Sequence, residues 1–242
     1  MANDLSKSLK DSLSPEFESI ISNAAELGID ALLEDGILKD IPFISSAISI
    51  YRIGKSIKER HNLKKLICFL DELNKCSLDE NNRNLYAEKF QQNEKFQKQQ
   101  LEYIMILIDR YLDYNKPRML AKLYLAYLFE YIDWQVFSTY AEIIDRLLPD
   151  DITYLMYAEN LFVVYEGRSD GIEPLLRLEG LGIITEDNQA KNRFITEPTR
   201  MVSKKIPIPR KVNSYYAYTD LGTKLRKIMK TKNICKLRDE EL

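Results

Sequence analysis

The chain has no glycine between Gly54 and Gly167, and only Pro117 and Pro149 interrupt this interval of 112 residues. Glycine and proline are the residues that most disfavour the interior of a helix, and they mark turns in most folds. Such an interval predicts helices joined by short polar turns. Five of the eight glycines and four of the eight prolines lie from Gly167 to Gly222, so we expect the β-strands there.

Apolar residues at helical spacing and helix-capping residues place the individual elements. Asp133 is expected to cap one helix, and Asp150 or Asp151 the next. Residues 183–185 are predicted to form a strand with partners at 194–196 and 213–218. Helices are expected from Ser14-Pro15, from Pro42, and over 62–75, 118–131, 134–147, 151–165, 171–180 and 220–230, with 78–114 forming one helix or two.

These elements predict a mostly α fold. An N-terminal helical region is expected over 1–116, and a helical and winged-helix-like α+β region over 117–230. Asn115-Lys116-Pro117 marks the boundary between them. The segment 231–242 is expected to be a charged tail, because it ends in "KLRDEEL".

The segment "IPFISSAISIYRIGKSIKERH" (41–61) contains a helix, 41–57, that is apolar around most of its circumference. Such a helix is either buried in a bundle or in contact with lipid. Its uncharged run, Ile41–Tyr51, is 11 residues long, against the roughly 20 that are needed to span a bilayer. A basic cluster follows, as in helices that lie on a membrane surface. The residues predicted to contact a membrane or a partner are Phe43, Ile44, Ile48, Tyr51, Arg52, Lys55, Lys58 and Arg60.

The stretch "DGILKDIPFISSAISIYRIGKSIKERHNLKKLICFLDELN" (35–74) resembles a segment that recurs in uncharacterised small bacterial proteins, some of them associated with mobile elements or with defence. The resemblance covers about 40 of the 242 residues. It implies a bacterial or phage origin and an accessory or antiviral defence role. It carries no functional residues.

The C-terminal part resembles the second half of a winged helix, in "LLRLEGLGIITED" (175–187) and "YYAYTDLGTKLRKIM" (215–229). The helix before the first wing strand reads the major groove in DNA-binding members. Here that helix has one arginine, Arg177, and the stretch 117–182 has five basic and 11 acidic residues. We therefore expect a poor DNA surface on the helix. The wing is basic, and its predicted contacts to nucleic acid or to an acidic partner are Lys191, Arg193, Arg200, Lys204, Lys205, Arg210 and Lys211.

The sequence contains no arrangement of residues typical of an enzyme. His61 is the only histidine and has no cysteine or second histidine at ligand spacing. The chain lacks the phosphate-binding motif of P-loop enzymes and the serine motif of hydrolases. Cys68 and Cys76 lack a histidine partner. We expect no catalytic residue, no metal site and no cofactor.

A formal net charge of −2 gives the chain no overall attraction to nucleic acid or to membranes. Three cysteines without a CxxC motif and an N-terminus without an apolar signal core indicate a cytoplasmic protein, with peripheral membrane attachment as an alternative. The leading hypothesis is a non-enzymatic interaction or regulatory protein with a protein partner or a second copy of itself. The alternatives are a DNA-binding regulator that uses the basic wing and a defence effector that perturbs membranes through 41–57.

Overall fold

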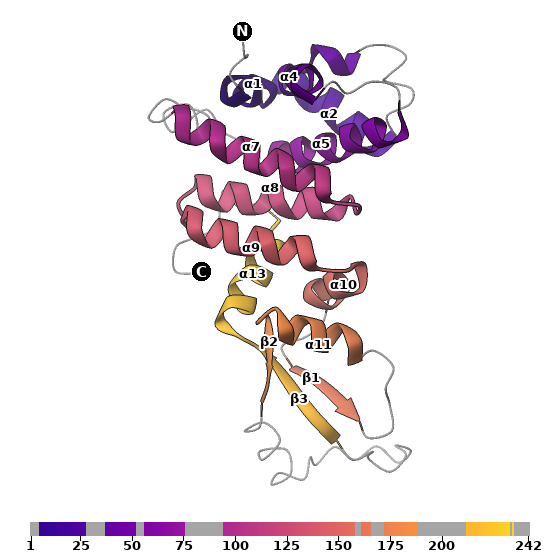
Figure 1. The fold of residues 1–242 in the computed structure, drawn as a ribbon, viewed down its shortest axis with the longest axis vertical. Helices are drawn as coiled ribbons and strands as arrows, with labels where there is room; N and C mark the ends of the chain where they lie inside the picture. Colours follow the sequence, from indigo (N-terminus) through magenta and orange to yellow (C-terminus); the bar gives the residue numbers. More distant parts are fainter. Residues whose placement is uncertain are drawn as a thin grey trace. The chain divides into compact units, whose positions relative to one another are not determined.

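The computed structural model describes residues 5–27, 37–51, 56–75, 94–157, 161–165, 172–187, 212–232 and 234. The chain is mostly helical, as its sequence predicts (Figure 1). It forms two compact units. Unit 1 contains Met1–Asp145 and Thr231–Leu242, and unit 2 contains Arg146–Lys230.

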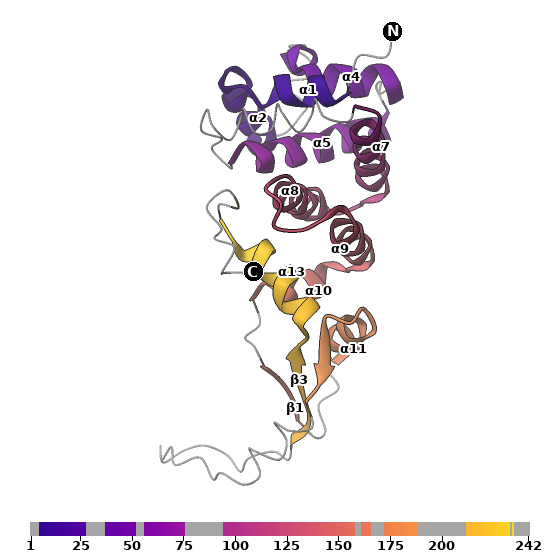
Figure 2. The same ribbon diagram turned by 90° about the vertical axis from the view of Figure 1, so that its left-hand side faces the viewer.

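Unit 1 is built from helices in layers (Figures 1 and 2). The helix α5 packs against α2, α7 and α8, and α1 packs against α4 and α7. Its elements are α1 (Leu5–Ser12), α2 (Pro15–Leu27), the 3₁₀ helix η1 (Ile37–Asp40), α4 (Pro42–Tyr51), α5 (Ile57–Lys75), α7 (Glu94–Arg110), α8 (Asn115–Leu128) and α9 (Trp134–Arg146).

Several of these helices begin where the sequence supplies a capping residue. Asp133 accepts the Val136 N–H at 2.8 Å, which confirms it as the cap of α9. At the start of α5, the Ser56 N–H donates to Glu59 Oε2 at 2.7 Å and the Glu59 N–H donates to Ser56 Oγ at 3.3 Å. This reciprocal capping box fixes the first turn of α5.

Aromatic side chains fill the core between α5, α8 and α9. Tyr124 of α8 is 1% exposed and lies 6.3 Å from Phe69 and 6.2 Å from Phe137, measured between ring centroids. Trp134 stacks on Phe137 at 4.6 Å. Because each large ring removes much apolar surface from water, these contacts hold the three helices together.

Ion pairs connect α5 to α8 beside this core. Asp71 is 5% exposed and pairs with Arg118 and, at 3.0 Å, with Lys75. Glu72 lies 3.8 Å from both Arg118 and Lys122. The charges of α8 are therefore engaged within unit 1.

The helix α4 packs its apolar side against α1. Phe43 and Ile44 have no exposed surface, and Ile48 is half-buried. The Phe43 N–H donates to Ser12 Oγ at 2.8 Å, and the hydroxyls of Ser8 and Ser46 lie 2.7 Å apart. A membrane or a partner could therefore contact Phe43 and Ile44 only after α4 separates from α1.

In its described residues, unit 2 combines the helices α10, α11 and α13 with a small sheet. The strand β3 lies in the centre and pairs antiparallel with β1 and β2, in the order β1-β3-β2. Val163 pairs with Tyr215 and Thr185 with Ala217. The elements are α10 (Pro149–Tyr157), β1 (Leu161–Tyr165), α11 (Ile172–Gly180), β2 (Ile184–Glu186), β3 (Val212–Tyr218) and α13 (Asp220–Lys230).

The start of α13 lies directly against the chain that leads into β2. Thr219 Oγ1 accepts the Gly222 N–H at 3.0 Å and donates to the Gly182 carbonyl at 2.6 Å. A Cβ on Gly222 would lie 2.0 Å from the Ile183 carbonyl oxygen. Glycine is required here because any side chain would overlap the backbone.

Three expectations from the sequence differ from the structure. The helix predicted over 151–165 ends at Tyr157, and Leu161–Tyr165 forms β1. Its run of Leu, Phe, two Val and Tyr favours a strand once β3 is available as a partner. The boundary predicted at 116 falls inside unit 1, because Asn115–Leu128 is the helix that packs on α5. The helix predicted over 41–57 corresponds to α4, which ends at Tyr51, and Ile57 belongs to the next helix, α5.

Other predicted positions agree with the structure or lie outside the described residues. The predicted helix 220–230 is α13, the predicted strand 213–218 is β3, and the predicted strand 183–185 overlaps β2. Residues 76–93 and the predicted strand 194–196 lie outside the described residues. Among the helices that the structure describes, none is both long enough and apolar enough to cross a bilayer.

Candidate interaction surface

The helix α11 separates its residues into a buried and an outward side. Pro174, Leu175 and Leu178 are buried, whereas Glu173 is exposed and Leu176 is 51% exposed. Glu173, Leu176 and Glu179 are spaced i, i+3, i+6, so they cover about one third of the helix circumference. The outward side therefore places a leucine between two carboxylates.

The single arginine of α11 is held by a buried carboxylate of α10. Arg177 Nε lies 2.9 Å from Asp151 Oδ1 and 3.1 Å from Oδ2, and Nη2 lies 2.8 Å from Oδ1. Asp151 has no exposed surface, and its Oδ2 also accepts the Leu148 N–H at 2.8 Å. Hydrogen bonding to Asp151 raises the pKa of Arg177, and the charges of Asp150 and Glu173 act in the same direction. Arg177 therefore joins α10 to α11.

Further carboxylates act on side chains in and beside α11. Asp150 and Glu173 both act on the Arg177 guanidinium. Burial chiefly raises the pKa of Tyr216 on β3, and the charges of Glu179 and Glu186 raise it further. Asp150 and Glu173 therefore lie within electrostatic reach of Arg177, and Glu179 and Glu186 within reach of Tyr216. We call this surface the acidic face: Asp150, Glu173, Leu176, Glu179 and Glu186.

A Schellman turn sets the direction in which the chain leaves α11. The Gly182 N–H donates to the Glu179 carbonyl at 2.8 Å, and the Ile183 N–H donates to the Leu178 carbonyl at 2.9 Å. Gly182 has a φ of 71°, a conformation that glycine adopts without strain. The second glycine of "GLG" thus ends the helix and directs the chain into β2.

The basic residues of α13 divide into two groups. Arg226 Nε donates to the Leu155 carbonyl at 3.2 Å, and its guanidinium lies 4.9 Å from the Tyr218 ring centroid. Arg226 therefore stabilises the C-terminal end of α10. Lys224, Lys227 and Lys230 are exposed and share one side of α13.

The structure places the predicted contact residues as follows. All seven wing residues, Lys191, Arg193, Arg200, Lys204, Lys205, Arg210 and Lys211, lie outside the described residues, as do Arg52 and Lys55. Tyr51 ends α4. Lys58 and Arg60 are exposed on the first turn of α5.

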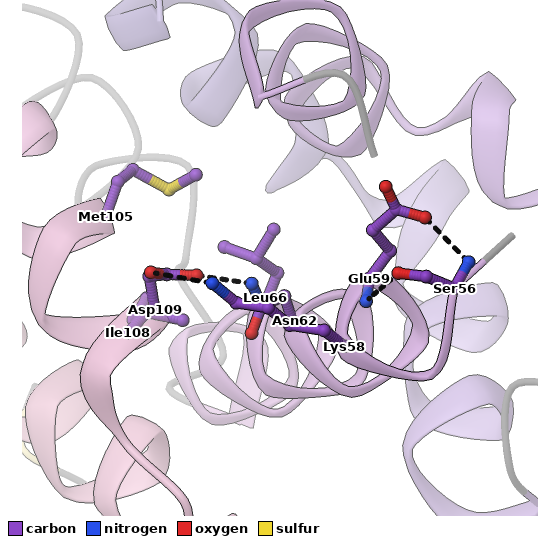
Figure 3. Close-up of a pocket in the computed structure, with 8 residues that line it drawn as sticks. All are labelled: Ser56, Lys58, Glu59, Asn62, Leu66, Met105, Ile108 and Asp109. Atoms are coloured by element: carbon purple, nitrogen blue, oxygen red, sulfur yellow. Dashed lines mark hydrogen bonds and ion pairs between the residues drawn. The ribbon is translucent and has the colours of Figure 1, made fainter. Parts of the chain in front are cut away.

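Unit 1 contains a pocket of about 320 Å³ between α5 and α7 (Figure 3). Leu66, Met105 and Ile108 are each less than 5% exposed and form its apolar wall. At the mouth, Asn62 donates to Asp109 Oδ1, and Lys58 Nζ lies 4.0 Å from Asp109 Oδ2. The polar groups at the mouth therefore pair with one another from the two helices.

A buried lysine lies beside this pocket at the end of α7. Lys65 Nζ donates to the backbone carbonyls of Asp109 at 2.8 Å and Tyr111 at 2.7 Å. Its position satisfies carbonyls that the helix leaves unpaired and places a cation at the negative end of the helix dipole. Burial lowers the pKa of Lys65 to about 8, against the opposing effect of Asp109. Lys65 therefore stabilises the end of α7.

His61 lies on the same helix as Lys65 and contacts Tyr114. Its Nδ1 is 2.7 Å from the Tyr114 hydroxyl, and Lys64 Nζ lies 4.7 Å from the Tyr114 ring centroid. Burial, together with the charge of Lys65, lowers the pKa of His61. Within the described ranges, no three histidine, cysteine, aspartate or glutamate side chains gather as metal ligands would.

The ion pair between Asp151 and Arg177 was not predicted from the sequence. Asp150 or Asp151 was expected to cap this helix, but α10 begins at Pro149, so Asp151 lies in the first turn and accepts the N–H of Leu148 before it. Its second role joins residues 26 positions apart, which helical periodicity does not reveal. The signal in the sequence is one arginine in an otherwise acidic stretch.

Comparisons with family models, with curated proteins and with solved structures found no match to this chain.

Proposed function

We propose that this chain is a non-enzymatic bacterial interaction or regulatory protein, with an accessory or defence-associated role, that acts by binding another macromolecule. Unit 2 is its winged-helix-like binding module. The binding surface is the acidic face, and the macromolecule that it contacts is a protein. The observation that carries this proposal is the outward side of α11, which presents Glu173, Leu176 and Glu179.

The topology of unit 2 supports the winged-helix assignment. A helix and a strand are followed by α11, by β2, and then by β3, which pairs with both other strands. In a winged helix, the wing is the sequence between the last two strands, which here is the sequence between β2 and β3. In this arrangement α11 corresponds to the helix that enters the major groove in DNA-binding members.

The charges of α11 favour a protein partner over DNA. A DNA-reading helix presents arginine, lysine, asparagine or glutamine to the bases. Here the outward residues are acidic or apolar, and Arg177 is engaged by Asp151. Carboxylates in this position would lie close to phosphates, so they would repel the backbone that supplies most non-specific affinity. An exposed leucine flanked by charges suits a protein interface.

DNA binding through basic residues is the second candidate function. The exposed Lys224, Lys227 and Lys230 of α13 favour it, together with the basic wing sequence. In this case Lys204, Lys205, Arg210 and Lys211 would contact phosphates and would not require α11. Affinity would then be independent of sequence and strongly dependent on salt.

Fluorescence anisotropy with mixed-sequence duplex DNA, at roughly 50 mM and 200 mM salt, separates the two functions. The proposal predicts no saturable binding by the wild-type chain at the lower salt concentration. Binding that weakens steeply with salt, and that is lost when Lys204, Lys205, Arg210 and Lys211 are changed to glutamate, would establish the DNA-binding regulator instead. Binding that survives this change would remove the wing as the DNA contact and favour α13.

A further inference from the structure

We propose that the partner of the acidic face is a second copy of this chain, whose basic segment 189–211 docks on α11. This inference rests on the proposed function, since it names the partner of the same surface. A different protein partner and DNA are outcomes of the test described below.

The two surfaces are complementary in charge. The segment 189–211 contains seven basic residues and one acidic residue, Glu197. The acidic face contains four carboxylates, and Arg177, the arginine of α11, is bound to the buried Asp151. The face therefore keeps a negative charge that the fold itself does not neutralise through Arg177.

The arrangement of the face fits an extended basic segment. Along α11, Leu176 lies between Glu173 and Glu179, while Asp150 acts on the Arg177 guanidinium and Glu186 on Tyr216. The segment "KKIPIPRK" (204–211) has cations at both ends and two isoleucines in the middle. Its order of charges matches that of the face, with an apolar residue available to cover Leu176. Each proline fixes one backbone dihedral angle, which lowers the conformational entropy that a segment of this composition loses on docking.

A second copy is the occupant that uses both surfaces of every molecule. Each copy carries one acidic face and one basic segment, so two copies can exchange two equivalent contacts. Such a pair closes on itself with twofold symmetry, as in most soluble homo-oligomers. Because the contacts are ionic and solvent-exposed, their strength falls with salt.

The test is sedimentation of the full-length chain over a range of concentrations, at roughly 50 mM and 500 mM salt. Variant A carries Glu173→Lys, Glu179→Lys and Glu186→Lys, and variant B carries Lys204→Glu, Lys205→Glu, Arg210→Glu and Lys211→Glu. In variant A both surfaces are basic, and in variant B both are acidic. Each variant should therefore repel itself, whereas a mixture of the two restores both attractive contacts.

We expect a wild-type dimer at low salt, with a dissociation constant at least about tenfold higher at high salt. Variants A and B alone should be monomeric, and their equimolar mixture should form a dimer. A control with Asp11→Lys and Glu102→Lys, two exposed carboxylates of unit 1, should dimerise like the wild type. Circular dichroism melting checks that each variant folds, and Glu173→Gln with Glu179→Gln replaces variant A if it does not.

Three results would overturn the inference. A wild-type chain that stays monomeric at low salt has no such contact. A dimer that survives in both variants uses another surface. A mixture of A and B that stays monomeric shows that the two surfaces do not meet. None of these results touches the proposed function, because the DNA anisotropy measurement decides that question separately.

Discussion

The charged residues of unit 1 and of unit 2 make different kinds of contact. In unit 1 the charges between helices pair with one another, as Asp71 does with Arg118, and Lys65 is bound to backbone carbonyls. In unit 2 the pair of Asp151 with Arg177 is internal, whereas Asp150, Glu173 and Glu186 are exposed and Glu179 is half-buried. The charges of unit 1 hold its own helices together, whereas we propose that those of the acidic face bind a partner.

This difference indicates which charged residues stabilise the fold and which are candidates for binding. An ion pair that is buried between helices fixes their packing, and its removal changes stability. Exposed carboxylates add little to stability, and their removal changes association. Substitutions in the two classes should therefore separate into those that unfold a unit and those that leave it folded.

The largest effect is expected from Gly222→Ala in unit 2. The added Cβ would lie 2.0 Å from the Ile183 carbonyl oxygen, so the start of α13 must move away from β2. We expect a loss of about 3 kcal/mol or more in the free energy of unfolding, measured by urea denaturation. Gly180→Ala is the matched control, because nothing lies within 4 Å of its Cβ position. Equal stability of the two variants would contradict this close approach.

The next largest effect compares the two buried carboxylates. Asp151→Ala leaves Arg177 without its partner and the Leu148 N–H without its acceptor, and should cost about 2–3 kcal/mol. Asp71→Ala should cost less, about 1–2 kcal/mol, because Arg118 keeps Glu72 at 3.8 Å. Urea denaturation of both variants gives the order.

A second substitution sharpens this comparison. Adding Arg177→Met to Asp151→Ala should recover part of the loss, because the unpaired cation is removed. If the double variant is less stable by the sum of the two single losses, the two side chains do not interact.

The third prediction concerns the pH dependence of unit 1. Lys65 has a pKa of about 8 in the folded chain, lowered from 10.5. Between these values the unfolded chain binds the proton more strongly, so the free energy of unfolding should rise with pH. We expect a gain of about 1 kcal/mol from pH 8 to about pH 9.5. Lys65→Met should lose this gain, and a wild-type chain whose stability falls over this range would contradict it.

The smallest effect is expected from Leu176→Ser on the acidic face. Leu176 is 51% exposed, so the free energy of unfolding should change by less than about 0.5 kcal/mol. Leu175→Ser is the control, because Leu175 is 4% exposed and should cost several times more. A loss above about 1 kcal/mol for Leu176→Ser would indicate that the outward side of α11 is packed within the chain.

The sequence predicts the helices best where capping residues and periodicity agree. Asp133 capped α9 as expected, and α13 has the predicted bounds. The strand β1 was missed because Leu161–Tyr165 continues an apolar run that fits either a helix or a buried strand. Only its pairing with β3, about 50 residues later in the chain, decides between them.

The excess of acidic residues in this region was noted from the sequence, whereas the contacts that bury or expose each carboxylate were not predicted. The excess of carboxylates over 117–182 indicated a surface unsuited to DNA. Which carboxylates face outward depends on tertiary packing: Asp150 is exposed, whereas its neighbour Asp151 is fully buried against Arg177. Adjacent residues of one type have opposite roles here, and periodicity within a single helix cannot assign them.

The central claim is that the outward carboxylates of α11 make unit 2 a protein-binding module and keep DNA away. Its most direct test is DNA anisotropy at roughly 50 mM salt for the wild-type chain and for Glu173→Lys with Glu179→Lys. The claim predicts no binding by the wild type and salt-dependent binding by the variant, with two added cations steepening the salt dependence by about two phosphate contacts. A wild-type chain that binds DNA as tightly as the variant would contradict it.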